Sequence, residues 1–382
     1  MNNRGRKQTL IRLYRAALEG SDPQRAVARA LREPRVAKIL REARRVGLFA
    51  VGKAAAGMAR GVPERWRGEA LVVLPASYPA PELPSAEILF ASHPEPGRSS
   101  LHAAKSALRF FSGFDREDVV LCLVSGGTSS LLALPRPGWT LTEKRRTIRR
   151  LMRSGASIVE VNRLRRSLSA IKGGRLGRST SARLVTLAVS DVPGDDPALI
   201  GSGPTVRGRR GDVTLVVSSN ASGLAAAARE ARRLGLVPVQ SRRRLSGEAR
   251  ESGRLFARAA AKLSRGEILL AGGETTVALP RRHGHGGRNL EFALGAAVEL
   301  EGSPVLTVLA AGSDGIDGSS RAAGAFADGS TIARARRFGL DPSLALLRHE
   351  TEEFFLRLSD LFVTGPTGNN VADWVFALRP NA

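Results

Sequence analysis

Glycines, hydroxyl residues, basic residues and aspartates follow many of the apolar segments of this 382-residue chain. Glycines let a backbone come close to phosphate oxygens, and hydroxyl and N–H groups donate to those oxygens. Lysine and arginine neutralise phosphate charge, and aspartates suit Mg²⁺, which usually takes one or two carboxylates. This inventory is what phosphoryl transfer requires. Its members are Lys53; Ser125, Gly126, Gly127, Thr128 and Ser129; Asp191, Asp195 and Asp196; Gly272, Gly273, Glu274 and Thr275; Arg288; Asp314 and Asp317; and residues 364–370.

Lys53 ends a G-x-x-x-x-G-K motif that begins at Gly47 and is followed by Ala54 instead of Ser or Thr. A phosphate-binding loop of this kind needs exposed backbone N–H groups between its glycines. Here the positions 48–51 are apolar and predict a buried strand. We therefore expect Lys53 at the carboxyl end of a strand, before a helix of small residues over 54–60, which is where open α/β sheets bind ligands.

Each candidate also has a structural interpretation that the sequence leaves open. The segment 125–130 could be a tight turn into a helix, aspartates often occupy turns and helix caps, and Arg288 could be a solvated arginine. Lys53 is harder to explain in this way, because it is one of only seven lysines among 59 basic residues. His283 and His285 could bind a metal, but two ligands without a nearby cysteine are a weak signal.

Short apolar segments separated by helical stretches must position these residues. Because the segments lack internal alternation, they predict parallel strands covered on both faces, and so a doubly wound α/β protein. Two echoes, SGGTSS with GGETT and SDVPGDD with SDGIDG, suggest two α/β halves with a cleft between them. The charged segment 239–266 marks the boundary, with a linking helix over 248–263. We expect domains at 1–245 and 246–382, and a helix over 8–18 packed on a sheet.

The composition limits the class of protein and its surroundings. The net charge is +24, but the arginines are scattered along helix-like segments instead of forming runs interleaved with aromatics, so a nucleic-acid partner is not expected. A positive field that attracts anionic substrates fits the same charge. No apolar run is long enough to span a membrane, and no secretory signal is apparent. With Cys122 as the only cysteine, in an apolar run, we expect a cytoplasmic protein without a membrane partner.

The order of the motifs resembles that of the glycerate 2-kinase family, whose C-terminal part is called the MOFRL domain. The resemblance extends from about residue 10 to residue 376. It is carried by VGKAAAGM, LVSGGTSSLL, VNRLRRSLSAIKGGRL, AVSDVPGDDPALIGSGPTV, AGGETTVAL, GHGGRNLEFALGAA, AAGSDGIDG, AAGAFAD and TGPTGNN.

The resemblance implies a Rossmann-like N-terminal domain with a mainly parallel sheet, a smaller α/β C-terminal domain of the MOFRL type, and an active site between them. It also implies ATP-dependent phosphorylation of D-glycerate at its 2-hydroxyl, with Mg²⁺. The motifs VGKA and GGRN then make Lys53 and Arg288 the catalytic basic residues, and SDVPGDD makes Asp191 a third candidate. Where the family usually has glutamine, this chain has Leu290, so a polar side chain is not expected to act at that position here.

From these residues we expect in-line phosphoryl transfer. ATP phosphates would lie against residues 125–129 and 272–275, with Mg²⁺ held through Asp191 or Asp314. Asp191 would accept the proton of the 2-hydroxyl, and Arg165 and Lys172 would hold the carboxylate of the substrate. A hydroxypyruvate reductase using NAD(P)H and a basic nucleic-acid-binding protein are the alternatives. The sequence leaves open whether the chain forms a homodimer.

Overall fold

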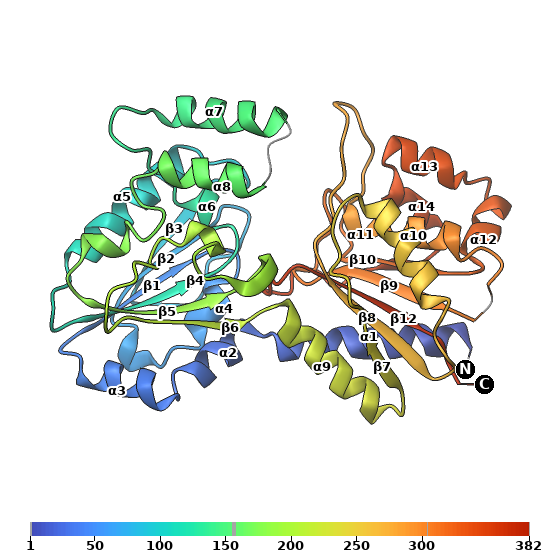
Figure 1. Ribbon diagram of the computed structural model, residues 1–382, viewed down its shortest axis with the longest axis horizontal. Coiled ribbons are helices and arrows are strands. Elements are labelled where there is room, and N and C mark those ends of the chain that lie inside the picture. The colour runs from blue at the N-terminus through green and yellow to red at the C-terminus, as the bar shows by residue number, and fades with distance from the viewer. Residues whose placement is uncertain (1, 155–157, 304, 382) are drawn as a thin grey trace. The chain divides into compact units, whose positions relative to one another are not determined.

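The computed structural model describes residues 2–154, 158–303 and 305–381. The chain forms two compact units, which we call the central unit, Asp22–Ser219, and the terminal unit, Met1–Ser21 with Asn220–Ala382. Each unit has its own sheet and its own apolar core (Figure 1). The expectation of two α/β domains is therefore confirmed.

The central unit contains a six-stranded sheet in the order β3-β2-β1-β4-β5-β6, with every neighbouring pair parallel. Its inner strands β1 and β4 are apolar and buried, as expected of parallel strands covered on both faces. This is the strand order of a Rossmann-type dinucleotide-binding sheet. The strands are β1 Val46–Val51, β2 Glu69–Pro75, β3 Ala86–Ala91, β4 Val119–Val124, β5 Arg183–Val189 and β6 Val213–Ser218.

Helices cover both faces of this sheet. Helices α2, α3 and α4 lie on one face and α5 to α8 on the other (Figure 1). Phe49, Cys122 and Phe111 belong to the core between the sheet and α5. Cys122 is fully buried, as expected. The helices are α2 Pro23–Ala30, α3 Pro34–Glu42, α4 Ala55–Arg60, α5 Arg98–Ser112, α6 Thr128–Leu131, α7 Leu141–Arg153 and α8 Ile158–Ser167, with short 3₁₀ turns at Glu64–Trp66, Gly177–Ser179, Pro193–Asp195 and Ile200–Ser202.

The terminal unit contains a second six-stranded sheet, in the order β11-β10-β9-β12-β8-β7. Only β7 and β8 pair in parallel, and the other neighbours are antiparallel. The expectation of parallel strands is therefore wrong for this unit. The segment 313–323 between β9 and β10 contains no helix to carry the chain over the sheet, so β10 returns antiparallel. The strands are β7 Val237–Gln240, β8 Glu267–Gly273, β9 Thr307–Gly312, β10 Gly324–Asp328, β11 Leu361–Phe362 and β12 Asp373–Leu378.

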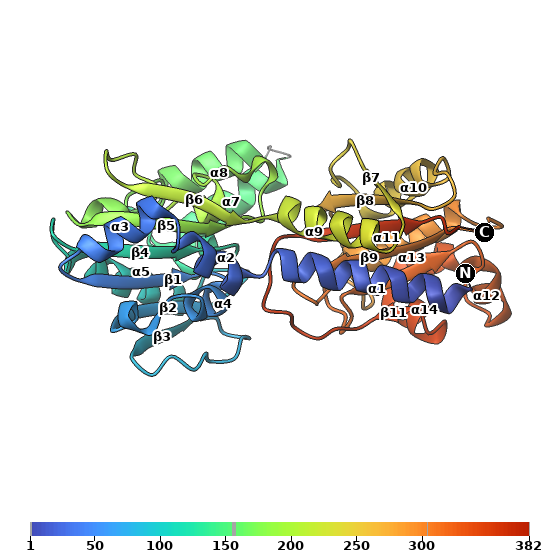
Figure 2. The same cartoon turned by 90° about the horizontal axis from the view of Figure 1, so that it is seen from below.

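The helices of the terminal unit also form two layers. Helices α10 and α11 pack on one face with α12 to α14 beside them, and α1 and α9 pack on the other (Figures 1 and 2). The predicted helix over 8–18 is part of α1 and buries Leu10, Leu13 and Tyr14. The helices are α1 Asn3–Gly20, α9 Asn220–Arg233, α10 Ala249–Ala260, α11 Arg288–Glu299, α12 Thr331–Arg337, α13 Pro342–Arg348 and α14 Thr351–Arg357.

The compact units divide at Ser21/Asp22 and Ser219/Asn220, whereas the sequence predicts a domain boundary at 245/246. Contacts of α1 and α9 explain the difference. The Tyr14 ring meets that of Trp374 edge-on at 5.8 Å, and Asn220 Nδ2 donates to the carbonyl oxygens of Val371 at 2.8 Å and Asp373 at 3.0 Å. The predicted linking helix over 248–263 is α10, which belongs entirely to the terminal unit and links nothing.

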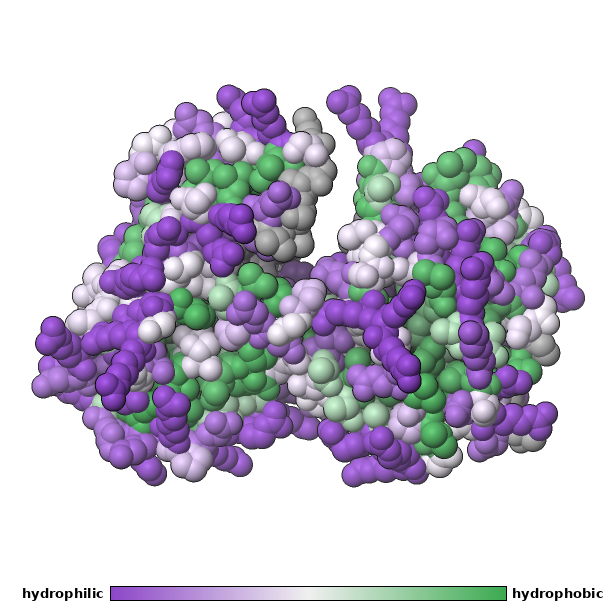
Figure 3. Space-filling model, in the orientation of Figure 1, coloured by the Kyte–Doolittle hydropathy of each residue, from purple (hydrophilic) through white to green (hydrophobic). Residues whose placement is uncertain are grey.

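Hydrophilic residues are spread over the visible face of each unit (Figure 3). Among the helices that the structure describes, none combines the length and apolar character that a membrane span needs.

Candidate functional site

Lys53 lies at the point where the strand order of the central sheet reverses. It follows β1, and the glycine-rich segment 125–130 follows β4, the adjacent parallel strand. Lys53 N donates to Gly126 O at 2.9 Å, so the two strand ends are in direct contact. Gly52 has φ +122°, and a Cβ there would lie 2.1 Å from Ser125 Oγ. The glycine is therefore needed for the contact, which occurs where open α/β sheets bind ligands.

The hydroxyl groups of the segment after β4 are bonded within the protein. Ser125 and Thr128 are buried, and the Thr128 hydroxyl donates to Ser125 O at 2.7 Å. Ser125 Oγ accepts from Ala54 N at 3.1 Å, and the hydroxyls of Ser129 and Ser202 are 2.7 Å apart. The hydroxyls of these predicted phosphate-binding residues therefore stabilise the loop itself.

His93, which follows β3, lies near Lys53 and Gly127 and was not predicted. A Cβ on Gly127, which has φ +87°, would lie 3.3 Å from both Lys53 Cγ and His93 Nε2. Burial, and secondarily the charge of Lys53, lower the pKa of His93. A neutral imidazole beside the lysine could donate a hydrogen bond without adding charge. The segment SHPEP that contains it offered no motif that would have identified it.

Asp191 follows β5, the strand next to β4, so it lies at the same edge of the sheet as Lys53. Its side chain is partly exposed. Asp195 and Asp196 come next, in a turn where Asp196 Oδ1 accepts from Ala198 N at 2.9 Å. The neighbouring strands β1, β4 and β5 of the central sheet thus bring Lys53, the glycine-rich segment and Asp191 to one edge of the sheet.

Arg165 and Lys172 line one cavity of about 270 Å³ beside the glycine-rich segment. Lys172 is only 4% exposed, and its Nζ donates to Ser129 O at 2.8 Å. Burial, followed by the charges of Lys144 and Arg165, places the pKa of Lys172 well below its usual value. Lys144 of α7 lines the same cavity and was not predicted, because the surrounding sequence EKRRTIRRLMR is typical of a solvated helix.

In the terminal unit, Arg288 is held by two carboxylates. Its Nε and Nη2 donate to Asp373 at 2.6 and 2.9 Å, and its Nη1 donates to Glu274 at 2.6 Å. The Asp373 side chain is 3% exposed and that of Glu274 is 50% exposed. Asp373 therefore fixes the guanidinium from the buried side, while Glu274 occupies its outer side. Both carboxylates hold the pKa of Arg288 above its usual value, against the opposing effect of burial.

Asp373 is positioned by the antiparallel pairing of β12. It is opposite Gly273 on β8 and Gly312 on β9, so it lies between the ends of these two strands. Burial raises the pKa of Asp373, and the charge of Arg288 opposes the rise. Sequence reasoning missed this residue, because in a parallel sheet the first residue of a strand would lie at the edge opposite the site.

Arg288 is also the first residue of α11, whose start is fixed by Asp317. Asp317 accepts from Asn289 N at 3.0 Å and from Leu290 N at 2.8 Å. Complete burial raises its pKa to about 7. Asp314, the predicted metal ligand in the same loop, accepts from Ile316 N at 3.3 Å. The Leu290 side chain is fully buried in the core, so position 290 has no polar role in this chain.

The glycines of the GGET segment are explained by packing. A Cβ on Gly272 would lie 1.8 Å from Asn220 Oδ1, and one on Gly273 would lie 2.3 Å from Leu245 O. Glu274 and Thr275 line a cavity of about 440 Å³ together with Arg288.

A buried pair that was not predicted, Glu291 and His349, also lines this cavity, with Oε1 and Nδ1 2.6 Å apart. Glu291 follows the GGRN segment by two residues, so the sequence could have indicated its place near Arg288, although not its burial.

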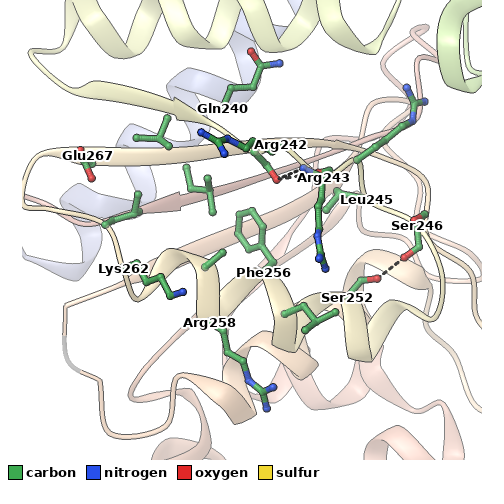
Figure 4. A pocket seen from close by; sticks show the side chains of 17 residues that line it. Gln240, Arg242, Arg243, Leu245, Ser246, Ser252, Phe256, Arg258, Lys262 and Glu267 are labelled. Carbon is green, nitrogen blue, oxygen red and sulfur yellow. Dashed lines mark hydrogen bonds between the residues drawn. The ribbon is translucent and has the colours of Figure 1, made fainter.

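A larger cavity of the terminal unit, about 690 Å³, contains none of the predicted catalytic or binding residues. Figure 4 shows Phe256 near its middle, with Arg242 and Arg243 on the loop at one side and Arg258 and Lys262 at the other. The three consecutive arginines 242–244 are exposed. The cavity is therefore separate from the residues that the motifs identify.

The predicted residues thus form two groups, one in each unit. Lys53, residues 125–129, Arg165, Lys172 and Asp191 belong to the central unit, and residues 272–275, Arg288 and Asp314 belong to the terminal unit. Within the described residues, nowhere do three or more His, Cys, Asp or Glu side chains gather as a metal site. Asp191 and Asp314, the two predicted metal ligands, lie in different units.

Comparison with known proteins places the chain in a family. Residues 9–232 match the model of a domain of unknown function, DUF4147, and residues 267–373 match the MOFRL family. A protein of Agrobacterium vitis that bears the name "putative hydroxypyruvate reductase" is 37% identical over 97% of this chain and 94% of its own length. The glycerate 2-kinase of Pyrococcus horikoshii is 32% identical over 96% of both chains.

The crystal structure of the glycerate kinase of Thermotoga maritima superimposes with a TM-score of 0.87 at 30% identity, covering 98% of this chain and 100% of that one. The match to the DUF4147 model ends at residue 232 and the match to the MOFRL model begins at residue 267, whereas the compact units divide at 21/22 and 219/220. The two family matches, the relatives and the shared fold lead to one conclusion: the chain belongs to the glycerate kinase family that joins a DUF4147 domain to a MOFRL domain.

Proposed function

We propose that the protein is a glycerate 2-kinase, which transfers a phosphoryl group from ATP to the 2-hydroxyl of D-glycerate. The observation that carries this proposal is the contact between Lys53 and the glycine-rich segment at the reversal point of the central sheet. An ammonium group beside closely packed backbone suits a phosphate ligand. Membership of the glycerate kinase family supports the same conclusion.

Lys53 and Arg288 are the proposed catalytic residues. Charge on the transferring phosphoryl group is spread over its oxygens, so fixed cations lower the barrier by electrostatic stabilisation. Arg288 is already oriented by Asp373, which reduces the cost of ordering its side chain. The ATP phosphates would bind main-chain N–H groups near residues 125–129, with residues 272–275 as the corresponding segment of the terminal unit.

Asp191 is the proposed general base for the 2-hydroxyl, because it lies at the same sheet edge as Lys53. Mg²⁺ would be held by Asp191 or Asp314. Each is a single carboxylate, which fits a cation that takes most of its ligands from water and phosphate oxygens. When bound, Mg²⁺ supplies charge neutralisation of the phosphates. Arg165 and Lys172 are the proposed partners of the substrate carboxylate.

A hydroxypyruvate reductase is the second candidate, because a relative carries that name. A Rossmann sheet binds a dinucleotide through G-x-G-x-x-G after the first strand and an acidic residue about 20 positions on. Here Ala54 replaces the second glycine, and the one acidic residue of β2, Glu69, begins the strand, so its carboxyl end at Leu74 and Pro75 has none. The residues therefore favour phosphoryl transfer over hydride transfer.

The test is incubation of the protein with ATP, Mg²⁺ and D-glycerate, followed by phosphorus NMR to separate the 2-phosphate from the 3-phosphate. Formation of ADP and 2-phosphoglycerate is expected. A parallel assay with hydroxypyruvate and NADH or NADPH follows cofactor absorbance. Cofactor oxidation without any ADP formation in the first assay would contradict the kinase proposal, and the 3-phosphate as product would contradict the stated position of transfer.

A further inference from the structure

The cavity between α7, α8 and the glycine-rich segment of the central unit contains an unusual excess of positive charge. Its lining includes Lys144, Arg145, Arg149, Arg165 and Lys172, against a single carboxylate, that of Glu95. Glu95 is 55% exposed and accepts from both Arg145 and Arg149. The other three cations therefore share the interior of the cavity without a carboxylate among its described lining residues.

Lys144 is the member of this group that the protein itself leaves unsatisfied. It is 4% exposed, and its Nζ has no hydrogen-bond partner among the described residues. Burial and the charge of Arg165 lower its pKa to about 8. An ammonium group without a partner is costly to bury. The arrangement is therefore explained if an anion completes it.

The remaining lining limits the size and chemistry of that anion. The apolar walls are supplied by Pro94, Ala133, Leu141, Ile148 and Met152, and Ser129 and Ser130 line the cavity with hydroxyls that are already bonded within the protein. The Ser130 hydroxyl donates to Pro94 O at 2.6 Å. A volume of about 270 Å³ is below the range usual for drug-sized ligands. It suits a small acid better than a whole nucleotide.

The cavity also adjoins the proposed phosphoryl-transfer site. Ser129, whose carbonyl accepts from Lys172, is two residues from Gly127, against which Lys53 and His93 lie. Pro94, which lines the cavity, directly follows His93. The segments 93–96 and 127–130 thus carry both the cavity wall and the surroundings of Lys53.

We infer that Lys144 joins Arg165 and Lys172 in binding the carboxylate of a small hydroxy acid, so that this cavity selects the acceptor of the reaction. The identity of the acid rests on the proposed function. The three cations bind and orient the acid, and the apolar walls exclude longer or more highly charged acids. Lys144 is thus a specificity-determining residue that no motif identified.

The experiment measures binding of D-glycerate to the full chain by isothermal titration calorimetry, with and without a non-hydrolysable ATP analogue. The variants are Lys144→Met, Lys144→Arg and, as a matched control, Lys105→Met, which alters an exposed lysine of α5. Lys144→Met should weaken D-glycerate binding about 10- to 100-fold, as expected for loss of a charged hydrogen bond. Lys144→Arg should recover part of the loss, and Lys105→Met should bind as the unaltered protein does. Glycerol, which lacks the carboxylate, should not bind.

Affinity for the ATP analogue should change less than about threefold in Lys144→Met, and KM for D-glycerate should rise while kcat is nearly retained. Unchanged binding of D-glycerate to Lys144→Met would overturn the inference. Loss of ATP-analogue binding with D-glycerate binding retained would also overturn it, because the cavity would then bind the triphosphate. The absence of D-glycerate binding to the unaltered protein under both conditions would overturn it as well.

Failure of the proposed function is separable from failure of this inference. If D-glycerate binds in a Lys144-dependent way but no ADP forms, the kinase proposal fails and the acid site stands. If ADP forms at an unchanged KM in Lys144→Met, the kinase proposal stands and the acid site fails. A thermal unfolding curve of each variant without ligand confirms that it is folded.

Discussion

Two groups of residues, one in each unit, hold positive charge in opposite ways. In the terminal unit, Arg288 is clamped by Asp373 and Glu274, so its charge is neutralised and its geometry fixed before any ligand arrives. In the central unit, Lys144, Arg165 and Lys172 share a cavity whose one carboxylate is bound by other arginines. The first arrangement favours orientation, and the second favours capture of an anion. The following variants test whether this difference corresponds to separate roles.

The largest effect is expected from Lys53→Ala, which removes a cation proposed to stabilise the transferring phosphoryl group. Loss of such a group typically lowers kcat by about 100- to 1,000-fold, or ~3–4 kcal/mol. The protein should remain folded, because the β1–β4 contact is made by the backbone N–H of Lys53 and by Gly52. Steady-state ADP release and circular dichroism measure the two properties. A wild-type kcat would remove Lys53 from the chemistry.

Asp373→Ala should affect stability and activity together, unlike Lys53→Ala. It deletes the buried partner of Arg288, and breaking a buried pair costs about 3–5 kcal/mol. We expect a loss of stability near the lower end of this range, because the Arg288 side chain is 32% exposed and can reach water. Urea unfolding measures the loss. Asp373→Asn, which retains one acceptor oxygen, is the control and should lose less stability. Equal activity in all three proteins would show that the clamp does not orient a catalytic arginine.

Strand ends were the part of the site that sequence reasoning could predict. The apolar runs at 48–51 and 119–124 fix strands by composition alone, so Lys53 and residues 125–129 could be assigned to one sheet edge. Roles that depend on other segments could not be predicted. Asp373 reaches Arg288 because β12 runs antiparallel between β8 and β9, and that direction is set by connections without helices.

Burial of charged residues was the other property that the sequence could not indicate. Lys144 belongs to a helix rich in arginine, and it is buried in a cavity that is also lined by residues of α8 and of the segments 94–96 and 129–133. Gly272 and Gly273 are a related case, because glycines that match a phosphate loop are also required by close contacts with Asn220 and Leu245. In both cases, contacts with residues distant in the sequence determine the structural role of the residue, and a local sequence pattern does not reveal those contacts.

Lys144→Met should stabilise the ligand-free protein near pH 7, because it removes a buried ammonium group that Lys172 and Arg165 repel. The pKa of Lys144 is lowered to about 8 from an unfolded value of 10.5. The unfolded chain therefore holds the proton more firmly between these values, and the stability of the unaltered protein rises as pH increases from about 8 towards 10.5. We expect an advantage of about 1–3 kcal/mol for Lys144→Met at pH 7 that shrinks at pH 9.5.

Urea unfolding at the two pH values, with Lys105→Met as the control, measures this difference. Destabilisation by Lys144→Met at pH 7 would mean that the lysine contributes to the fold, and the contrast between a clamped and an unsatisfied cation would then disappear. A constant difference at both pH values would show that Lys144 does not titrate in this range.

The smallest effect is expected from Glu274→Gln, which alters the outer half of the clamp. The Glu274 side chain is 50% exposed, so its ion pair with Arg288 contributes only about 0–1 kcal/mol to stability. Its effect on binding should be more informative, because a phosphate oxygen that approaches Nη1 of Arg288 must displace this carboxylate. Glu274→Gln should therefore lower KM for ATP by a fewfold, while KM for D-glycerate stays the same. A raised KM for ATP would instead indicate that Glu274 helps to hold the nucleotide or its metal, and the clamp would then have a binding role in place of a purely orienting one.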